Sequence, residues 1–449
     1  MMPASIVGMD IAGLSSAFRE GDLTPVDVFE AYAERIAAYD PLITAFVGLR
    51  LDEARQEADA SARRWSAGTP LSPIDGIPIA VKANIAVEGL ACHAGIEAYR
   101  NDVAVENAEV VDRLVQAGAI MLGTLNMHEG ALGATTDNPA FGRTLNPRNL
   151  AYTPGGSSGG SGAAIAAGLA AGALGSDTMG SVRIPSAYCG CVGHKPSPGI
   201  IPTDGIVPLS TTLDHVGPHA RSVEDLEILM GVLSAGFTRA EPPKIENVRV
   251  GVWNWQGKVD VEAAVSDGFS DALERLAAAG LQTCEVEPPD YVYGKDRRAG
   301  LLVSEREAAA VHADRLKVAP DGFSAEFKAM MAWGAKRPAE EYDACLARFE
   351  TLRASASRLF ETVDFVVSPV APQPAFKFGD KVPANQADFT AWANFAGLPA
   401  TAVPTGASAA GLPLALQIIG PAGSDAETLA FARIVEGILG RLPVATPAI

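Results

Sequence analysis

The sequence predicts an α/β protein: one large domain with a mixed, mostly parallel central β-sheet covered by helices on both faces. Short apolar runs alternate with helical patterns along most of the 449 residues, and this alternation is typical of such a sheet. Hydrophobic residues make up 48% of the chain and charged residues 20%, a balance that allows a sizeable core and argues against disorder. No repeat or polar linker marks a boundary, so we expect a single domain over residues 1–449.

The N-terminal part begins with helices and then enters the sheet. Thr24 can cap a helix whose first turn accepts Pro25, and apolar residues then follow at helical spacing. Residues 77–82 form an apolar run after a turn at Asp75 and Gly76, which predicts a strand. The other elements expected up to residue 123 are helices over 51–65 and 110–117 and a strand over 120–123.

The C-terminal half returns to ordinary helix and strand patterns after Ser222. Residues 300–362 are mostly helical in pattern and carry most of the mixed charge, and a Pro-rich loop spans 369–383. The expected helices cover 223–233, 261–279 and 426–439, and the expected strands cover 248–253, 365–367, 400–403 and 414–419.

Charge and cysteine content argue against several classes of function. The 53 acidic and 35 basic side chains give a formal net charge of −18, and no long Lys/Arg run provides the basic patch that nucleic-acid binding needs. The five cysteines lack metal-ligand spacing, so they predict no zinc site and fit a reducing compartment best. The segment MMPASIVGMD lacks a signal-peptide pattern, and no stretch reaches the roughly 18 apolar residues of a membrane span. We therefore expect a soluble, cytoplasmic protein.

A Gly/Ser-rich segment occupies residues 155–162 and runs into a small-residue helix over 163–167. A glycine-rich turn before a helix exposes backbone N–H groups that can bind an anion. No Gly-Lys-Ser/Thr follows it and no Gly-x-Gly-x-x-Gly follows a strand, so it does not match a phosphate-binding loop. On this segment alone, a flexible loop before a closely packed helix is the simpler interpretation.

A second segment, residues 174–185, places Ser181 at the end of a glycine-containing turn, with Asp177 four residues before it and Arg183 two residues after it. A nucleophilic serine needs exposure at a constrained turn, a proton acceptor, and N–H donors for the developing oxyanion. The turn can provide the first and the third. The proton acceptor must come from elsewhere in the chain.

Lys82 is the candidate for that proton acceptor. None of the six histidines forms a defensible Ser…Asp…His order, whereas Lys82 ends an apolar strand. Strand alternation puts Ile79 and Val81 on one face and Lys82 on the other. Desolvation there would lower the pKa of the lysine toward neutrality. An exposed lysine at the end of a strand is the alternative interpretation.

Six short segments carry a pattern that extends, in one order, over almost the whole chain. They are Asn126 to Glu129, Gly155 to Ser161, Gly175 to Pro185, Cys189 to Pro196, Leu213 to Pro218, and Gly411 to Pro421. Together with Lys82 these segments resemble the amidase signature family, and a composite pattern of this length is very specific. The resemblance implies the amidase signature fold.

The resemblance also implies a Ser–cisSer–Lys site that requires neither a metal nor an organic cofactor. Ser181 would be the nucleophile that forms an acyl-enzyme, Ser157 the serine preceded by a cis peptide bond, and Lys82 the base. Neutral Lys82 would take a proton from Ser157, which relays one from Ser181, and the reverse path would protonate the leaving nitrogen. Further implied roles are an oxyanion hole from the N–H groups of Thr178, Met179, Gly180 and Ser181, an ion pair of Asp177 with Arg183, and hydrogen-bonding support from Ser158 and Thr178.

The implied activity is hydrolysis of C–N acyl bonds in linear amides or carbamates (urethanes). The substrate would be a small molecule that reacts with water, without direct nucleic-acid or membrane partners. The implied catalytic core covers about residues 70–225 and 395–440, and a variable region at about 290–395 would shape the pocket. If its large apolar side chains line the mouth, we expect a fairly hydrophobic acyl or leaving group. Those side chains are Phe323, Phe327, Met330, Met331, Trp333, Phe376, Phe378 and Trp392.

Met179 departs from the family pattern, which usually has glycine at this position. If the turn required a positive φ there, a methionine would be strained by roughly 1–2 kcal/mol. We expect its side chain to line or back the acyl pocket and so to influence substrate choice. His128 and His194 also occupy positions where the family usually has other residue types.

Two other functions stay open at this point. One is the glutaminase subunit of a tRNA-dependent amidotransferase, which shares the implied fold and triad and works with a partner. The other is a noncatalytic binding or scaffold protein on the same fold. A homodimer is a reasonable expectation for a large soluble enzyme.

Overall fold

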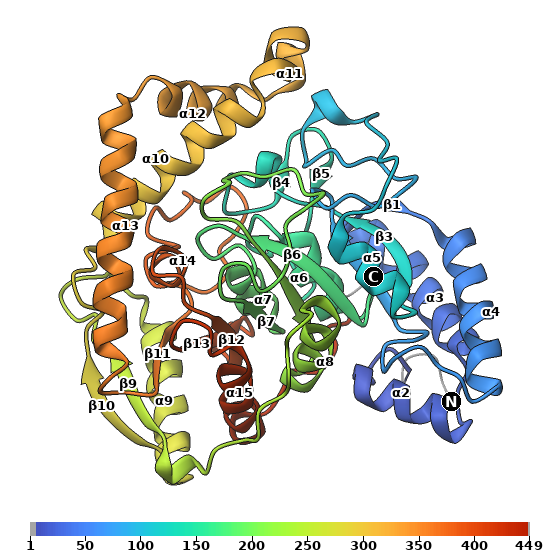
Figure 1. The fold of residues 1–449 in the computed structure, drawn as a ribbon. Helices are drawn as coiled ribbons and strands as arrows, with labels where there is room; N and C mark the ends of the chain where they lie inside the picture. Colours follow the sequence, from blue (N-terminus) through green and yellow to red (C-terminus); the bar gives the residue numbers. More distant parts are fainter. Residues whose placement is uncertain (1–5, 448–449) are drawn as a thin grey trace.

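The computed structural model describes residues 6–447. The first five residues of the segment MMPASIVGMD and the last two residues of the predicted domain lie outside this range. One 11-stranded sheet has the order β1-β3-β2-β6-β8-β7-β12-β13-β11-β9-β10. Figure 1 shows it crossing the molecule. Its strands are β1 (Phe46–Leu49), β2 (Pro78–Lys82), β3 (Ile120–Leu125), β6 (Gly172–Asp177), β7 (Val192–Lys195), β8 (His215–Ala220), β9 (Arg249–Trp253), β10 (Gln282–Val286), β11 (Phe365–Pro369), β12 (Ala400–Ala407) and β13 (Pro413–Ile419). A separate hairpin pairs β4 (Asp137–Asn138) with β5 (Gly142–Arg143).

The sheet is mixed, as predicted. Its parallel pairs form two blocks: β3-β2-β6 and β11-β9-β10. The other six neighbouring pairs are antiparallel. The sheet therefore contains more antiparallel pairs than the alternation of strands and helices in the sequence predicts. The reason is that the central strands β8, β7, β12 and β13 pair as antiparallel neighbours.

Helices cover both faces of the sheet, which confirms the predicted layers. The helices are α2 (Ile11–Glu20), α3 (Pro25–Ile43), α4 (Leu51–Ser66), α5 (Glu109–Gln116), α6 (Gly159–Ala167), α7 (Arg183–Cys189), α8 (Val223–Leu233), α9 (Ala263–Ala278), α14 (Ala391–Phe395) and α15 (Asp425–Leu439). Ile79 and Val81 of β2 point into a core shared with α2, α5, α8, α9 and α15, whereas Ala80 points into a core shared with α3, α4 and α6.

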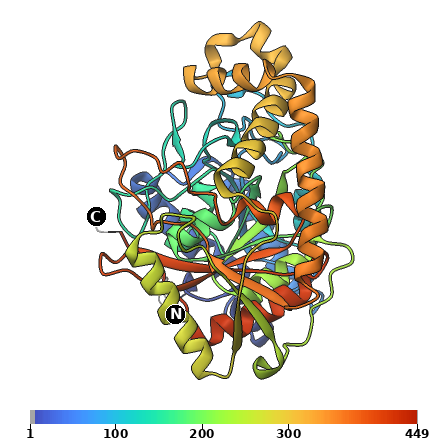
Figure 2. The ribbon, with the colours of Figure 1, turned by 90° about the vertical axis from the view of Figure 1, so that its left-hand side faces the viewer.

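The helical region predicted near residues 300–362 forms an extension beside the sheet (gold to orange in Figures 1 and 2). It consists of α10 (Tyr293–Val311), α11 (Ala313–Val318), α12 (Ala325–Ala335) and α13 (Ala339–Leu359). We call these four helices the cap. The stacked rings of Phe349 on α13 and Phe395 on α14, 4.5 Å apart, connect the cap to the main body.

Local sequence signals set several of the element boundaries. The Thr24 side chain accepts a hydrogen bond from the backbone N–H of Asp27, and the Asp27 carboxylate accepts one from the N–H of Thr24, so a capping box starts α3 ahead of Pro25. The predicted helices near 51–65, 110–117, 223–233, 261–279 and 426–439 are present, as are the predicted strands. Within residues 6–447 no helix combines the length and the apolar character needed to cross a membrane.

Seven strands were not predicted: the short or peripheral β1, β4, β5 and β10, and the central β6, β7 and β8. The last three lie in the segment rich in Gly, Ser and Ala. Their composition disfavours strands in isolation, but close packing explains it. A Cβ atom at Gly175 of β6 would lie 2.6 Å from the His219 ring and 2.8 Å from the Ser158 hydroxyl. Glycine is therefore required where a strand passes this close to its neighbours.

Candidate active site

The candidate site lies where β2 and β6 end. These strands are parallel neighbours, so their carboxyl ends reach the same edge of the sheet, where α/β proteins commonly bind ligands. Lys82 is the last residue of β2 and Asp177 the last residue of β6. The sequence segments around them therefore meet in space.

Lys82 is fully buried, which rules out the exposed strand-end lysine considered above. Its Nζ donates to the Ser157 hydroxyl at 2.7 Å and to the Ser176 hydroxyl at 2.8 Å. Burial lowers the pKa of this lysine to about 7, although the charges of Asp214 and Asp177 act in the opposite direction. A substantial fraction of neutral amine at neutral pH follows, which is what a proton acceptor needs.

Ser157 follows a cis peptide bond, Gly156–Ser157, as the resemblance implies. The bond lies in the glycine-rich loop just before α6, and the Ser157 carbonyl accepts from the N–H of His128 at 3.0 Å. A Cβ atom at Gly156 would lie 2.7 Å from the Gly133 carbonyl oxygen and from the Thr135 nitrogen. The glycines therefore allow a second loop to pack directly against the one that carries Ser157.

The turn after β6 is organised by the buried Asp177 carboxylate. It accepts from the backbone N–H of Gly180 at 2.7 Å and of Val182 at 3.1 Å, and it pairs with Arg183 at 3.0 Å. Burial alone would raise the pKa of Asp177, but the Arg183 guanidinium beside it holds that pKa well below its usual range. The expected ion pair is therefore present, with both side chains fully buried.

Arg183 also ties the turn to distant parts of the chain. Its guanidinium donates to the Thr390 carbonyl at 2.9 Å, to Gln417 Oε1 at 3.0 Å and to Asn394 Oδ1 at 2.6 Å. Asn394 in turn donates to the Asp177 carboxylate at 3.0 Å. The turn that carries Ser181 is thus fixed by side chains from α14 and β13.

Gly180 has a φ of 132°, which side-chain-bearing residues rarely adopt. A Cβ atom here would also lie 2.3 Å from the Thr390 hydroxyl. Because its N–H is donated to Asp177, Gly180 does not fit the oxyanion-donor role expected for it. The N–H groups of Thr178, Met179 and Ser181 are the remaining candidates in this turn.

Met179 does not have a positive φ, so the strain considered for it does not arise. Its carbonyl accepts from the Thr390 hydroxyl at 2.6 Å. Its sulfur packs toward α10, where a Cβ atom at Gly300 would lie only 2.7 Å away. The side chain lines the pocket beside Ser181, in agreement with the expected position.

Ser181 lies on the wall of a cavity of about 150 Å³, together with Thr178, Met179, Gly180 and Gly156. Most of the other lining side chains are apolar, and Arg297 is the charged one in the part of the chain that the structure describes. The Arg297 Nε donates to Asp388 Oδ1 at 2.7 Å. The apolar members of the wall are Ala131, Leu132, Ala134, Ile184, Leu209, Leu301, Met330, Pro383, Ala384 and Ala387.

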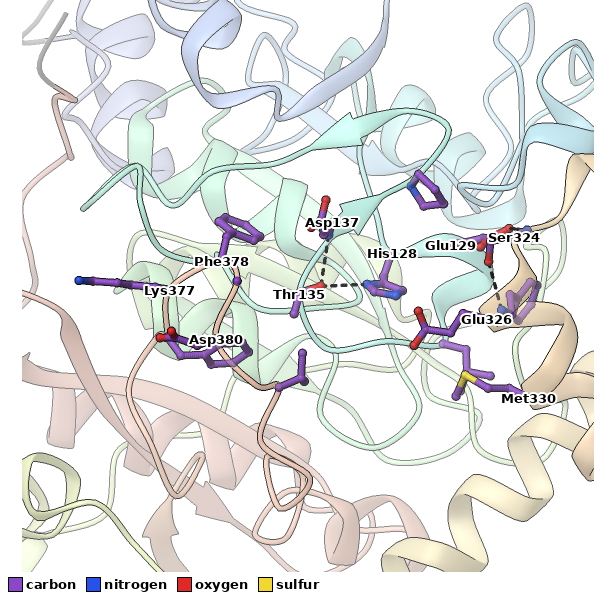
Figure 3. A pocket seen from close by; sticks show the side chains of 16 residues that line it. His128, Glu129, Thr135, Asp137, Ser324, Glu326, Met330, Lys377, Phe378 and Asp380 are labelled. Carbon is purple, nitrogen blue, oxygen red and sulfur yellow. Dashed lines mark hydrogen bonds between the residues drawn. The ribbon is translucent and has the colours of Figure 1, made fainter.

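Figure 3 shows a larger cavity of about 480 Å³. Leu132 and Met330 line both this cavity and the pocket beside Ser181. We call the larger one the outer cavity. Phe327, Met330, Phe376 and Phe378 line it, so these four of the eight expected apolar side chains reach a cavity. Phe323, Met331 and Trp392 are core residues instead, and Trp333 packs against Arg337. The charged lining residues are Glu129, Asp137, Glu326, Asp380 and Lys377.

The histidines near the site are poor proton acceptors for Ser181. Burial lowers the pKa of His128 to about 4 and the pKa values of His215 and His219 to about 3. His194 lies away from the pocket and connects strand to helix through Thr401 (2.9 Å) and Asp425 (3.2 Å). Among residues 6–447, no group of three or more His, Cys, Asp or Glu side chains is placed to hold a metal ion.

Sequence reasoning missed three polar residues of the site. Ser176 is the second hydroxyl on Lys82, Asn84 donates toward Ser176 at 3.4 Å, and Asp214 accepts from the Thr178 hydroxyl at 2.6 Å. Two of them could have been found from their position in the sequence, since Asn84 follows Lys82 by two residues and Ser176 directly precedes Asp177. Ser158 forms the expected local support, with its hydroxyl donating to the Ser176 carbonyl at 3.1 Å.

Comparisons with known proteins show which family this chain resembles in sequence and in structure. The family model described as Amidase matches residues 27–429. The A subunit of glutamyl-tRNA(Gln) amidotransferase from Thermosynechococcus vestitus is 34% identical over 435 residues, which cover 88% of this chain and 90% of that protein. A solved amidase structure is 32% identical with a TM-score of 0.88, and the match covers 96% of this chain and 100% of that one. The native peptide amidase of Stenotrophomonas maltophilia is 27% identical with a TM-score of 0.85, covering 97% and 98%.

The fold and these matches define the class of protein as a C–N hydrolase. The chain belongs to the amidase (amidase signature) family. The resemblance inferred from its sequence motifs is thereby confirmed.

Proposed function

We propose that the protein is an amidohydrolase that cleaves linear amides or carbamates through an acyl-enzyme on Ser181. The observation that carries this proposal is the buried Lys82 amine, with a pKa of about 7, at 2.7 Å from the Ser157 hydroxyl. Ser181 lies on the same pocket wall as Gly156, the residue that precedes Ser157. These two observations support a relay that runs from Ser181 through Ser157 to Lys82.

In the first half of the reaction, the Ser181 hydroxyl attacks the substrate carbonyl carbon. Its proton passes to Ser157, and the Ser157 proton passes to neutral Lys82. The oxyanion that develops accepts hydrogen bonds from backbone N–H groups of Thr178, Met179 or Ser181. Collapse of the intermediate breaks the C–N bond, and the proton returns by the same path to the leaving nitrogen.

In the second half, water attacks the acyl-enzyme and loses a proton along the same relay, which releases the acid and restores Ser181. The Asp177–Arg183 pair supports the turn and does not take part in proton transfer. Every step uses groups of the chain and water.

The cavities favour a restricted set of substrates. The pocket beside Ser181 is small and mostly apolar, which suits a compact hydrophobic acyl group. The outer cavity combines apolar walls with four carboxylates and one lysine, so we expect it to favour neutral or cationic leaving groups over anionic ones. Anilides, alkyl amides and alkyl carbamates fit this description.

The proposal is tested by labelling with a fluorophosphonate, followed by mass spectrometry of the digested protein. We expect one adduct on Ser181, and no adduct at this position in Ser181→Ala. A panel of amides, carbamates and esters then defines the substrate class. Turnover of a small polar amide, combined with equal inactivity on anilide and carbamate probes, would contradict the proposed class.

A second function is supported by the Arg297–Asp388 pair near the pocket. A positive and a negative side chain 2.7 Å apart could recognise an α-carboxylate and an α-ammonium group, as in glutamine. The similarity to the A subunit of glutamyl-tRNA(Gln) amidotransferase points the same way. If the purified chain hydrolyses glutamine only when partner subunits are added, this second function is the correct one.

A further inference from the structure

A chain of hydrogen bonds leads from the turn beside Ser181 to the cap. The Thr178 hydroxyl donates to Asp214 Oδ1 at 2.6 Å, and the backbone N–H of Ser210 donates to Asp214 Oδ2 at 3.1 Å. The Ser210 hydroxyl then donates to Glu307 Oε2 of α10 at 2.5 Å. Tyr342 of α13 donates to the other oxygen of Glu307 at 2.7 Å.

Each carboxylate in this chain collects several neutral donors. Asp214 also accepts from the backbone N–H of Leu209 at 2.8 Å. Glu307, which is 8% exposed, also accepts from the N–H and the hydroxyl of Thr212. The loop between residues 209 and 214 is thus held at one end to the turn and at the other to the cap.

A second contact joins the same turn to the cap. Met179, the residue after Thr178, packs its sulfur against α10 at Gly300. Two consecutive residues of the turn are therefore positioned by the cap, one through hydrogen bonds and one through packing. The N–H groups of both are oxyanion-donor candidates under the proposed function.

We propose that Asp214 and Glu307 are positioning residues that make the geometry of the oxyanion turn depend on how the cap is seated. This inference rests on the proposed hydrolase function. Their role is indirect: Asp214 acts through Thr178, and Glu307 acts through Ser210 and Asp214. A loosened cap would misplace the oxyanion donors without breaking the hydrogen bond between Lys82 and Ser157.

A double-mutant cycle between Thr178→Val and Glu307→Ala tests this inference. Thr178→Val removes the hydroxyl and keeps the shape, and Thr178→Ser is the conservative variant that should retain activity. We expect each single variant to lower kcat about tenfold while KM changes by less than about twofold. Both substitutions interrupt the same chain of hydrogen bonds. The kcat of the double variant should therefore be only slightly lower than that of the less active single variant.

The inference is overturned if Glu307→Ala leaves kcat unchanged. It is also overturned if the fold-decrease in kcat of the double variant equals the product of the fold-decreases of the two single variants. Tyr342→Phe, which removes one donor to Glu307 and leaves the buried carboxylate in place, replaces Glu307→Ala in the cycle if that variant does not fold. Failure of the proposed function gives a different result, since the wild-type protein would then neither hydrolyse amides nor be labelled at Ser181.

Discussion

Lys82 Nζ lies 2.7 Å from Ser157 Oγ, and both side chains are fully buried. The same amine lies 2.8 Å from Ser176 Oγ, so two hydroxyls bind one lysine. Under the proposed mechanism they differ in role, because the proton relay runs through Ser157 and not through Ser176.

The two hydroxyls provide a matched pair of variants. We expect Ser157→Ala to lower kcat by roughly 10²–10⁴-fold, since it removes the relay between base and nucleophile. Ser176→Ala removes one bond to the same amine, and we expect at most about a tenfold loss. Steady-state kinetics on one amide substrate compare the two, and equal losses would argue against a relay through Ser157.

We expect the buried Asp177–Arg183 pair to contribute strongly to the free energy of unfolding of the protein. Arg183→Met leaves a buried carboxylate without its cation, and breaking a buried pair in this way typically costs about 3–5 kcal/mol. Arg353→Met, which breaks the exposed pair with Glu350, is the control and should change stability far less. Urea unfolding measures both, and similar effects of the two substitutions would contradict this account of the turn.

Gly180 is expected to tolerate no side chain. Gly180→Ala adds a Cβ atom 2.3 Å from the Thr390 hydroxyl at a φ of 132°, so we expect loss of activity and a destabilisation of roughly 1–3 kcal/mol. Gly257 also has a positive φ, of 70°, but a Cβ atom added there would meet no other atom within 4 Å. Gly257→Ala therefore separates backbone strain from the collision, and it should leave activity intact.

Met179 is expected to limit the acyl group. Met179→Ala enlarges the pocket beside Ser181, so kcat/KM for longer acyl chains should rise by about tenfold relative to short ones. Met331→Ala is the control, because Met331 is a core residue that does not line either cavity. We expect the control to lose stability with an unchanged acyl preference. If Met179→Ala leaves the acyl preference unchanged, Met179 does not determine which acyl groups the pocket accepts.

The sequence predicted those features that depend on short-range patterns. Alternation along residues 77–82 places Ile79 and Val81 in one core and Ala80 in the other, which puts Lys82 on the side of α6. The capping signal at Thr24 and Pro25 likewise fixed the start of a helix. Both follow from chemistry within a few residues.

Features that depend on distant parts of the chain could not be predicted. Asn394 and Gln417 bind Arg183 across more than 200 residues of sequence, and no local pattern marks them. Strands β6, β7 and β8 contain glycines where groups from other parts of the chain lie too close for a side chain, so their composition gave no local strand signal. The donor role expected for Gly180 was wrong for a similar reason, since its N–H turns toward Asp177.

The central claim is that neutral Lys82 activates Ser181 through Ser157. The most direct test is the rate of fluorophosphonate labelling of Ser181 as a function of pH, measured by mass spectrometry. Because the pKa of Lys82 is lowered to about 7 and only the neutral amine accepts a proton, the rate should rise with pH through about 7 and then level off. The account also predicts that this rise disappears in Lys82→Met, with labelling slowed by a factor of about 10³. A labelling rate that does not depend on pH between about 5 and 9, or an unchanged rate in Lys82→Met, would contradict it.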